Sequence, residues 1–230
     1  MTLYFLVYND NTHLQYLTNL LDSVKKYNKE FEIIIFNKKD IDVDFVNKNS
    51  LILNLPRGGG YWLWKPYIIN NLLLKINYDD IIFYLDSKYY FTEDFTNLYN
   101  DYMITNDLLV WNNKPNEESY LMKNYCKMDV IIKYGLYNEV FKENAIDCWA
   151  GGLVVKKTNN TLNLIKEWLD IACVYENITD SNSYIKNYID FIEHRHDQSC
   201  LNVVLKRNNV NPAIFFPKKF LQNIRMPYTL

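Results

Sequence analysis

Short apolar runs alternate with stretches of helical spacing through the first 86 residues of the chain. The runs are bounded by polar residues and favour strands, whereas leucines recurring every three or four positions after the first run favour a helix. The predicted strands cover 2–8, 31–37, 51–56 and a run that ends at Asp86, and the predicted helices cover 12–27 and 62–76. This alternation is typical of a mostly parallel sheet with helices on its faces.

The second half of the chain continues the alternation with weaker signals. Strands are predicted at 107–111, 148–157 and 213–217, helices at 123–134, 158–176 and 196–208, and loops at 112–119 and 180–184. Gly135 is placed to end the first of these helices. Neither a repeat nor a linker rich in Pro, Gly or Ser divides the chain, so we expect one α/β domain over residues 1–230.

Composition narrows the class of protein. Of 230 residues, 49% are hydrophobic and 16% aromatic, which is typical of a globular chain and excludes a disordered one. The formal net charge of −2 lacks the basic excess of nucleic-acid binders, so we expect no nucleic-acid partner. No stretch approaches the roughly 20 apolar residues of a membrane helix, and no basic leader precedes the first strand.

The cysteines indicate a reducing compartment. They are scattered along the chain without metal-ligand spacing and are interpreted as reduced core thiols. They are Cys126, Cys148, Cys173 and Cys200. We therefore expect a cytoplasmic protein.

Asp86 stands where the apolar run "IIFYL" stops, at the carboxyl end of a predicted strand. Ligands of open α/β sheets bind beyond these strand ends, so Asp86 is a candidate ligand-binding residue. Lys88 follows at the position where a second acid would complete a pair of metal-binding carboxylates.

Three glycines at 58–60 connect the third predicted strand to the following helix. Two interpretations stay open, a backbone that approaches a phosphate at a helix N-terminus or an ordinary flexible connection. The segment fits neither the P-loop nor the dinucleotide-binding pattern. Because an apolar core needs neither Arg57 nor Lys65, which flank the glycines, we expect one of them to contact phosphate.

Two further segments carry candidate chemistry. In "HRHDQS" (194–199), Asp197 either caps a helix or joins the histidines in a metal site. In "CWAGG" (148–152), the glycines mark either a bulge or a close approach by a small ligand, and Trp149 could stack on a sugar ring. No nucleophile elbow and no H-E-x-x-H motif occurs, so hydrolase assignments have little support.

Taken together, "RGGGYWLWKPYII", "DDIIFYLDS", "LMKNYCKMDV", "AGGLVVKKTNNTLNLIKEWL" and "HRHDQSCLNVVL" resemble nucleotide-sugar glycosyltransferases of large DNA viruses and of bacterial polysaccharide loci. More distantly, the chain is similar to glycosyltransferase family 8, the glycogenin-like retaining enzymes of GT-A fold. The resemblance covers about residues 1–216. It implies a single Rossmann-like domain with a mostly parallel sheet, and the host cytoplasm as the location if the protein is viral.

In that family a D-x-D motif at a strand end holds a divalent metal on the donor diphosphate, and a later histidine often completes the coordination. Asp86 and Ser87 match the first two positions, whereas Lys88 departs from the third. The resemblance therefore implies Mn²⁺ or Mg²⁺ bound by Asp86 and His196, with weaker binding because of Lys88.

The resemblance also implies the remaining roles. Asp197 and Gln198 match the "DQ" near the reacting sugar carbon and, with Lys65, are the expected catalytic residues. The expected donor-binding residues are Tyr8, Asn9, Arg57, Gly59, Gly60, Trp64, Lys65, Asp86, Ser87, Gly151 and Gly152. The implied reaction moves a sugar from a UDP-linked donor to a glycan or glycoprotein acceptor, while the oligomeric state stays open.

Cations at the leaving diphosphate would stabilise the transition state. We expect retention of configuration, because the chain resembles retaining enzymes, in which the departing phosphate can take the acceptor's proton. An inverting enzyme would need a carboxylate base, for which Asp197 is the best candidate and Asp129 a weaker one. Two alternatives remain, a metal-dependent phosphohydrolase that uses His194, His196, Asp197 and Asp86, and a non-catalytic sugar-binding module.

Overall fold

A five-stranded sheet forms the centre of the molecule in the computed structural model, which describes residues 1–10, 14–94, 96–112, 120–142, 145–211 and 221–223. Its strand order is β2 (Phe31–Phe36), β1 (Leu3–Tyr8), β3 (Ile81–Leu85), β6 (Cys148–Lys156) and β5 (Leu108–Asn112). Strands β2, β1 and β3 pair in parallel, and β6 pairs antiparallel with both β3 and β5. The sheet is thus mostly parallel, as expected, with β6 reversed.

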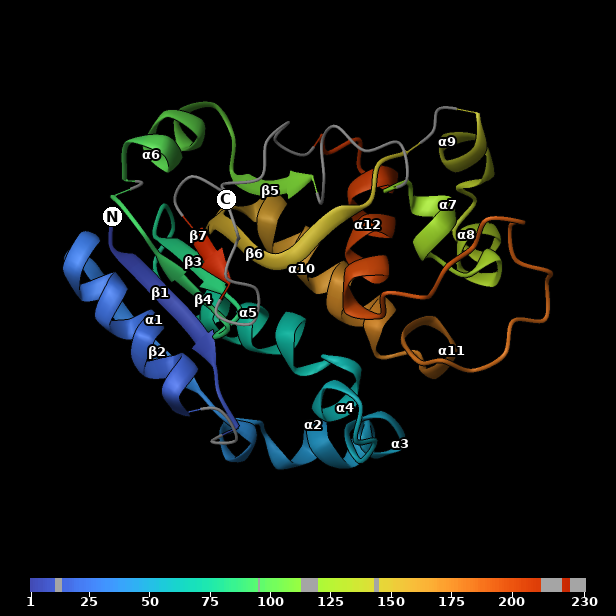
Figure 1. The fold of residues 1–230 in the computed structure, drawn as a ribbon, viewed down its shortest axis with the longest axis horizontal. Coiled ribbons are helices and arrows are strands. Elements are labelled where there is room, and N and C mark those ends of the chain that lie inside the picture. Colours follow the sequence, from blue (N-terminus) through green and yellow to red (C-terminus); the bar gives the residue numbers. More distant parts are fainter. Residues whose placement is uncertain (11–13, 95, 113–119, 143–144, 212–220, 224–230) are drawn as a thin grey trace.

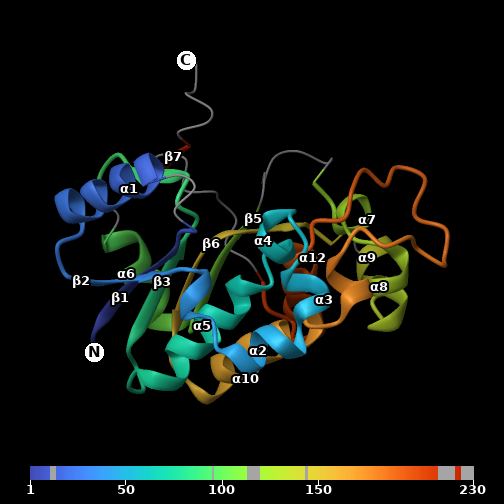
Figure 2. The same ribbon diagram turned by 90° about the horizontal axis from the view of Figure 1, so that it is seen from below.

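Helices cover both faces of this sheet (Figures 1 and 2). On one face lie α5 (Trp64–Lys75), α10 (Asn159–Ala172) and α12 (Asp197–Arg207), and on the other lies α1 (Leu14–Tyr27). Successive residues of β3 alternate between the two cores: Ile82 and Tyr84 face α5 and α10, whereas Phe83 faces α1. This double burial explains why β3 is an uninterrupted apolar run.

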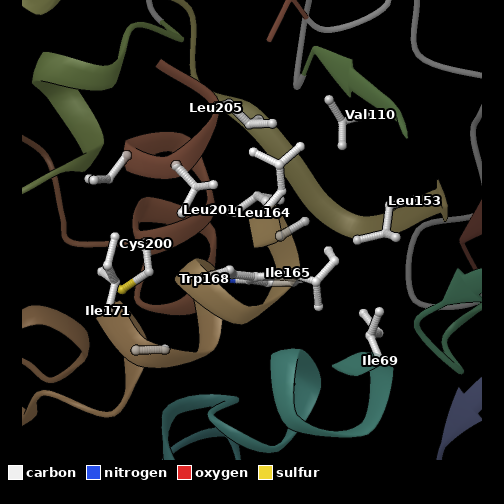
Figure 3. Close-up of a cluster of buried hydrophobic side chains, with 14 of the residues drawn as sticks. Ile69, Val110, Leu153, Leu164, Ile165, Trp168, Ile171, Cys200, Leu201 and Leu205 are labelled. Carbon is white, nitrogen blue, oxygen red and sulfur yellow. The ribbon is translucent and has the colours of Figure 1, made fainter. Parts of the chain in front are cut away.

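The core between β6, α10 and α12 fixes the start of α12 (Figure 3). Trp168 of α10 is fully buried there and donates from its indole Nε1 to the carbonyl oxygen of Asp197 at 2.8 Å. The first residue of α12 is therefore held by the core itself.

Shorter elements connect and flank these layers. They are η1 (Lys38–Asp40), α2 (Val43–Lys48), α3 (Ser50–Leu53), α4 (Gly58–Tyr61), α6 (Thr96–Thr105), α7 (Met122–Tyr125), α8 (Met128–Lys133), α9 (Tyr137–Phe141) and α11 (Tyr175–Ile178). Strands β4 (Tyr89–Phe91) and β7 (Leu221–Asn223) form a separate antiparallel pair.

The strand predicted at 51–56 is wrong, because these residues begin in helix α3. Leu51 is exposed, Ile52 and Leu53 are buried, and Asn54 is exposed again, which is the burial order of a helical turn and not of a strand. The amides of Ile52 and Leu53 both donate to Asn49. A short apolar run cannot by itself distinguish the two structures.

Two predicted helices are each divided in the structure. The helix predicted at 123–134 becomes α7 and α8, because Cys126 and Lys127 are extended between them. The helix predicted at 158–176 becomes α10 and α11, and the side chain of Asn177 donates to the carbonyl of Ile171 near the end of α10. In both cases extended backbone, which includes Val174 between α10 and α11, interrupts a continuous helical pattern.

Most of the other predicted elements are confirmed within a few residues, and α5 begins at Trp64. The strand predicted at 213–217 and nearly all of the loop predicted at 112–119 lie outside the described residues. None of the helices in the described part of the chain combines the length and apolar character that a membrane crossing requires.

Candidate functional site

Two pockets meet beyond the carboxyl ends of β1 and β3. The first, here called the aromatic pocket, has a volume of about 370 Å³ and is lined by Tyr8, Asn9, Asp10, Tyr16, Pro56, Gly58, Gly59, Trp62, Trp64, Tyr84, Asp86, Ser87 and Lys88. The second, the charged pocket, has a volume of about 340 Å³ and is lined by Arg57, Trp62, Lys65, Asp86, Lys88, Trp149, Ala150, Gly151 and residues 193–198. Trp62, Asp86 and Lys88 belong to both.

A pair of stacked rings forms part of the aromatic pocket. Tyr8 ends β1 and stacks on Trp64, which begins α5, with ring centroids 3.8 Å apart and an interplanar angle of 14°. Burial, followed by the charge of Asp10, raises the pKa of Tyr8 to about 12, so its hydroxyl stays protonated at neutral pH. This side of the site offers a flat apolar surface with a hydroxyl and nearby polar groups.

The glycine segment forms a left-handed turn beneath this pocket. Gly58, Gly59 and Gly60 have φ of 58°, 60° and 97°, and Tyr61 and Trp62 follow at 52° and 59°. Left-handed backbone is unfavourable for residues with a Cβ, so two such residues in succession mark a conformation that its surroundings enforce. Trp64 Nε1 secures the turn by donating to the carbonyl of Gly58 at 3.0 Å.

The three glycines differ in how closely they are packed. A Cβ on Gly60 would lie 2.7 Å from the Cα of Leu53, and one on Gly58 would overlap the Trp62 ring, whereas one on Gly59 would find space. The turn therefore requires glycine at 58 and 60 for packing. Gly59 is the exposed member and faces the pocket.

A buried lysine joins the two aspartates of the site. The Lys65 ammonium lies 2.8 Å from Asp197 Oδ2 and 3.5 Å from Asp86 Oδ1, and it donates to the carbonyl of Ala150 at 3.1 Å. The Lys65 side chain is only 4% exposed. It connects α5, β3, β6 and α12, so the predicted catalytic residues Lys65 and Asp197 form one buried ion-pair network with Asp86.

The pKa values in this network follow burial and charge together. Burial raises the pKa of Asp197 to about 6, against the opposing effect of Lys65. Burial also disfavours ionised Asp86, but Lys65 and Lys88 outweigh it and hold the pKa of Asp86 below its ordinary value. For Lys65, the two carboxylates overcome burial and raise the pKa. At neutral pH all three groups are charged.

Both oxygens of Asp86 face positive charge. Lys65 approaches Oδ1, and Lys88 approaches Oδ2 at 3.7 Å, because the backbone turns between Asp86 and Tyr89. Tyr84 donates its hydroxyl to Oδ1 at 2.7 Å. Among the described residues, no group of three or more His, Cys, Asp or Glu side chains is arranged to hold a metal ion. This donor set fits a divalent cation poorly, because the carboxylate is already shared by two ammonium groups.

The predicted metal ligand His196 lines the charged pocket together with Asp86 but has partners of its own. Its Nδ1 donates to the carbonyl of Ile178 at 2.8 Å, and its Nε2 lies 3.8 Å from Asp180. Its ring stacks on Trp62, and burial lowers its pKa. An ion shared by Asp86 and His196 stays a prediction.

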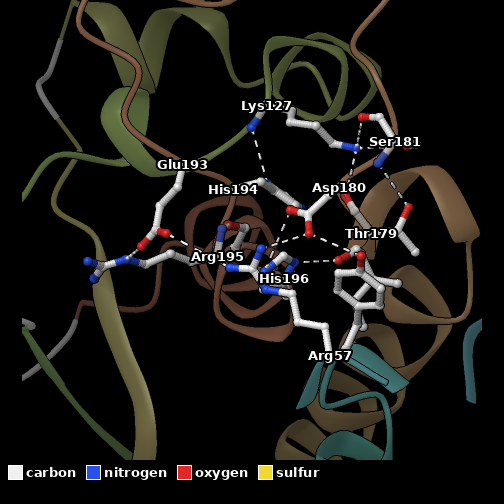
Figure 4. Close-up of polar contacts among 12 residues, drawn as sticks. Arg57, Lys127, Thr179, Asp180, Ser181, Glu193, His194, Arg195 and His196 are labelled. Atoms are coloured by element: carbon white, nitrogen blue, oxygen red, sulfur yellow. Dashed lines mark hydrogen bonds and ion pairs between the residues drawn. The ribbon is translucent and has the colours of Figure 1, made fainter. Parts of the chain in front are cut away.

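Arg57 and Asp180 lie next to His196 (Figure 4). Arg57 Nη1 is 2.8 Å from Asp180 Oδ2, which also accepts from the Tyr61 hydroxyl, and Arg57 Nη2 is 4.0 Å from Glu193. Arg57 lines the charged pocket but does not line the aromatic pocket. Sequence reasoning missed Asp180, which lies in a predicted loop with no signal beyond its charge.

Both ring nitrogens of His194 have hydrogen-bond partners, so His194 is not free to bind a metal ion. Its Nδ1 accepts from the Lys127 amide and its Nε2 donates to the carbonyl of Asn177 at 2.7 Å. Burial lowers its pKa to about 3. The four-residue metal site required by the phosphohydrolase alternative is therefore not assembled in this structure.

Gln198 fixes the strand that borders the charged pocket. Its Oε1 accepts from the Ala150 amide at 3.2 Å, and its Nε2 donates to Asp147 at 2.6 Å. Arg195 Nη1 also lies 3.5 Å from Asp147, an acid that sequence reasoning missed. Gln198 therefore holds α12 against β6 at the pocket wall.

Gly151 and Gly152 accommodate Trp149. A Cβ on Gly151 would lie 2.4 Å from the Trp149 ring, and Trp149 is only 6% exposed, with its ring against Tyr89 and Trp111. The glycines thus have a packing role, and Gly151 also lines the charged pocket. The large buried surface of Trp149 leaves little of the ring for stacking on a sugar.

Most of the predicted site residues therefore line one of the two pockets, whereas Gly60 and Gly152 line neither. The aromatic pocket includes Tyr8, Asn9, Gly59, Trp64 and Ser87, and the charged pocket includes Arg57, Lys65, Gly151, His196, Asp197 and Gln198, with Asp86 in both. Tyr84 was missed because it reads as a core residue, although its place two positions before Asp86 puts both on the same side of the strand. Asp129 lies apart, where it accepts from the amides of Tyr184 and Ile185.

Comparison with known proteins gives a likeness in fold. No family model matches the chain, and no curated protein matches it. The WbbM bifunctional glycosyltransferase aligns at a TM-score of 0.52 with 13% identity, over 88% of this chain and 37% of that chain. The galactosyltransferase LgtC in complex with donor and acceptor sugar analogues aligns at 0.46 with 16% identity, over 87% and 69%. GlyE of Streptococcus pneumoniae TIGR4 aligns at 0.45 with 16% identity, over 90% and 44%.

This chain thus spans less than half the length of WbbM and of GlyE. At these identities the likeness concerns the fold and not the activity. The mostly parallel α/β fold of GT-A type expected from the sequence is confirmed, and the chain shares this fold with WbbM.

Proposed function

We propose that this protein is a glycosyltransferase that moves a sugar from a nucleoside-diphosphate donor to a glycan or glycoprotein, with UDP as the expected nucleoside diphosphate. The observation that carries the proposal is the pair of pockets that meet at Trp62, Asp86 and Lys88. The aromatic pocket suits a base and ribose, and the charged pocket suits a sugar and the acceptor hydroxyl. The likeness in fold to WbbM, a glycosyltransferase, supports the same function.

The reaction breaks the bond between the sugar C1 and the β-phosphate oxygen and forms a bond from C1 to the acceptor oxygen. Positive groups near the β-phosphate stabilise the charge that develops on the leaving group. Asp86 and Lys65 hold those positive groups in position, and Gln198 keeps the wall of the charged pocket in place.

Retention of configuration is proposed because carboxylates of the charged pocket already have cationic partners. Asp197 is paired with Lys65, and Glu193 lies 3.3 Å from Arg195. An inverting enzyme needs a carboxylate base for the acceptor hydroxyl, whereas in a retaining enzyme the leaving phosphate can take that proton. The anomeric configuration of the product, read by proton NMR, distinguishes the two.

The test is a thermal-shift screen of UDP, GDP and TDP with their sugar conjugates, followed by an assay for release of the nucleoside diphosphate. Binding to the folded state alone raises the melting temperature by mass action. We expect one nucleotide series to stabilise the protein, and its sugar conjugate to be consumed faster when glycan acceptors are added. Absence of any shift at millimolar nucleotide, combined with release of phosphate from simple phosphoesters, would contradict the proposal. A shift with glycans alone would indicate a sugar-binding module instead.

A further inference from the structure

Lys88 lies at the junction of the two pockets, where a donor that occupies both pockets would place its diphosphate. It lines both pockets, together with Trp62 and Asp86. A ligand with its base in the aromatic pocket and its sugar in the charged pocket joins the two through the diphosphate. The linking phosphates therefore pass the ammonium group of Lys88.

The charges at this junction are already balanced without a metal ion. Two carboxylates, Asp86 and Asp197, face two ammonium groups, Lys65 and Lys88, at 2.8–3.7 Å. A divalent cation placed on Asp86 would be repelled by both lysines. A diphosphate placed beside Lys88 would instead meet positive charge.

The two lysines differ in what they can reach. Lys65 is 4% exposed and held by Asp197 and the carbonyl of Ala150, so it is a fixed part of the pocket floor. Lys88 is 35% exposed and bonded to Asp86 alone among the ion pairs of the described residues. Its long side chain can therefore turn from Asp86 to a bound phosphate, while Lys65 and the Tyr84 hydroxyl stay in contact with Asp86.

We propose that Lys88 binds the donor diphosphate in place of a divalent cation, with Asp86 and Lys65 holding it in position. The inference rests on the proposed function and adds to it a metal-independent donor site. In the transition state the Lys88 ammonium stabilises the negative charge that develops on the β-phosphate as the bond to the sugar breaks.

The experiment is titration calorimetry of UDP and of GDP, each in EDTA and in Mn²⁺. The proteins are the wild type, Lys88→Gln, Lys88→Arg, Lys88→Asp and the control Lys166→Gln. Lys166 is an exposed lysine on α10 that pairs with Asp170, so its substitution matches the charge change of Lys88→Gln. Circular dichroism and melting temperature establish that each variant is folded.

We expect the wild type and Lys166→Gln to bind one nucleotide with similar affinity in EDTA and in Mn²⁺. Lys88→Gln should bind it about tenfold or more weakly in EDTA, the scale of losing one charged hydrogen bond, and Lys88→Arg should keep most of the affinity. Lys88→Asp completes a pair of carboxylates with Asp86, so its binding should be weak in EDTA and should recover in Mn²⁺.

Loss of wild-type binding in EDTA would overturn the inference, because the metal would then carry the diphosphate. Wild-type affinity in Lys88→Gln would overturn it as well, since Lys88 would have no part in binding. Both results leave the proposed function standing. If the wild type binds neither nucleotide in either condition, the proposed function fails and the inference falls with it.

Discussion

The aromatic pocket and the charged pocket share three residues but are built in different ways. The aromatic pocket takes every lining residue from positions 8–88, and its stacked rings come from the end of β1 and the start of α5. The charged pocket joins distant segments: Lys65 and Ala150 are 85 positions apart, and Ala150 and Gln198 are 48 apart. Its central ion pair, between Lys65 and Asp197, is almost fully buried.

The difference indicates how each pocket responds to substitution. A ring at the open end of a pocket contributes surface for a ligand, and the fold tolerates its loss. A buried ion of the charged pocket is part of the packing between helices and sheet, so its removal leaves a charge without a partner. Substitutions should thus affect ligand binding in the aromatic pocket and stability in the charged pocket.

The largest expected effect is on stability, from Lys65→Met. Removing the ammonium leaves Asp86 and Asp197 buried without their shared partner, which should lower the free energy of unfolding by about 3–5 kcal/mol. Lys88→Met, at a partly exposed position beside the same aspartate, should lower it by no more than about 1 kcal/mol. Urea denaturation of both variants measures the difference. Equal stability of the two would remove the contrast between the pockets.

Gly60→Ala tests a position next to the aromatic pocket at which substitution should affect stability. Its Cβ would collide with the backbone of Leu53 at a φ of 97°, whereas the Cβ of Gly59→Ala would make an ordinary van der Waals contact with Trp64 Nε1, 3.7 Å away, at a φ of 60°. Because both pay for left-handed backbone, the collision should make Gly60→Ala less stable than Gly59→Ala by about 1–3 kcal/mol. Thermal unfolding of the pair provides the measurement. If Gly59→Ala is the less stable variant, the packing described here for the left-handed turn is wrong.

Tyr8→Leu tests the ring surface. Losing the aromatic face should cost about 0.5–1.5 kcal/mol of nucleotide affinity, up to about tenfold in Kd. The free energy of unfolding should fall by no more than about 1 kcal/mol, since Tyr8 is only half-buried. Tyr78→Leu, which removes an exposed ring away from both pockets, is the control for calorimetry with UDP. Unchanged affinity in Tyr8→Leu would place the base elsewhere.

The smallest expected effect is a pH dependence of turnover. Asp197 has a pKa of about 6, raised by burial, so it is ionised and paired with Lys65 above that pH and protonated below it. The rate should therefore be about half its plateau near pH 6 and fall further at lower pH. Burial lowers the pKa of His196, so His196→Gln should keep this limb of the profile. A flat profile down to pH 5 would exclude Asp197 as its source.

Local patterns in the sequence were sufficient for much of the fold and for one side of the site. The apolar run before Asp86 identified β3 and its strand end, and the three glycines marked as a candidate phosphate contact the segment that forms the left-handed turn. The run at 51–56 failed, because so short a segment fits a strand and a helical turn equally well.

The charged pocket could be predicted only in part. Lys65 and Asp197 were both named from their own segments, yet nothing in either segment encodes that they pair with one another. Asp147 and Asp180 were missed because single acids in loops are common. Their importance comes from Arg195, Gln198 and His196, which the tertiary fold brings to them.

The most direct test of the account is a crystal structure of the protein soaked with UDP in the presence of Mn²⁺, with diffraction data collected at the manganese absorption edge. The account predicts the base against Tyr8 and Trp64, the diphosphate within hydrogen-bond distance of Lys88 Nζ, and no anomalous peak beside Asp86. A diphosphate bound outside the junction of the two pockets, or a manganese peak that joins it to Asp86 and His196, would contradict the account.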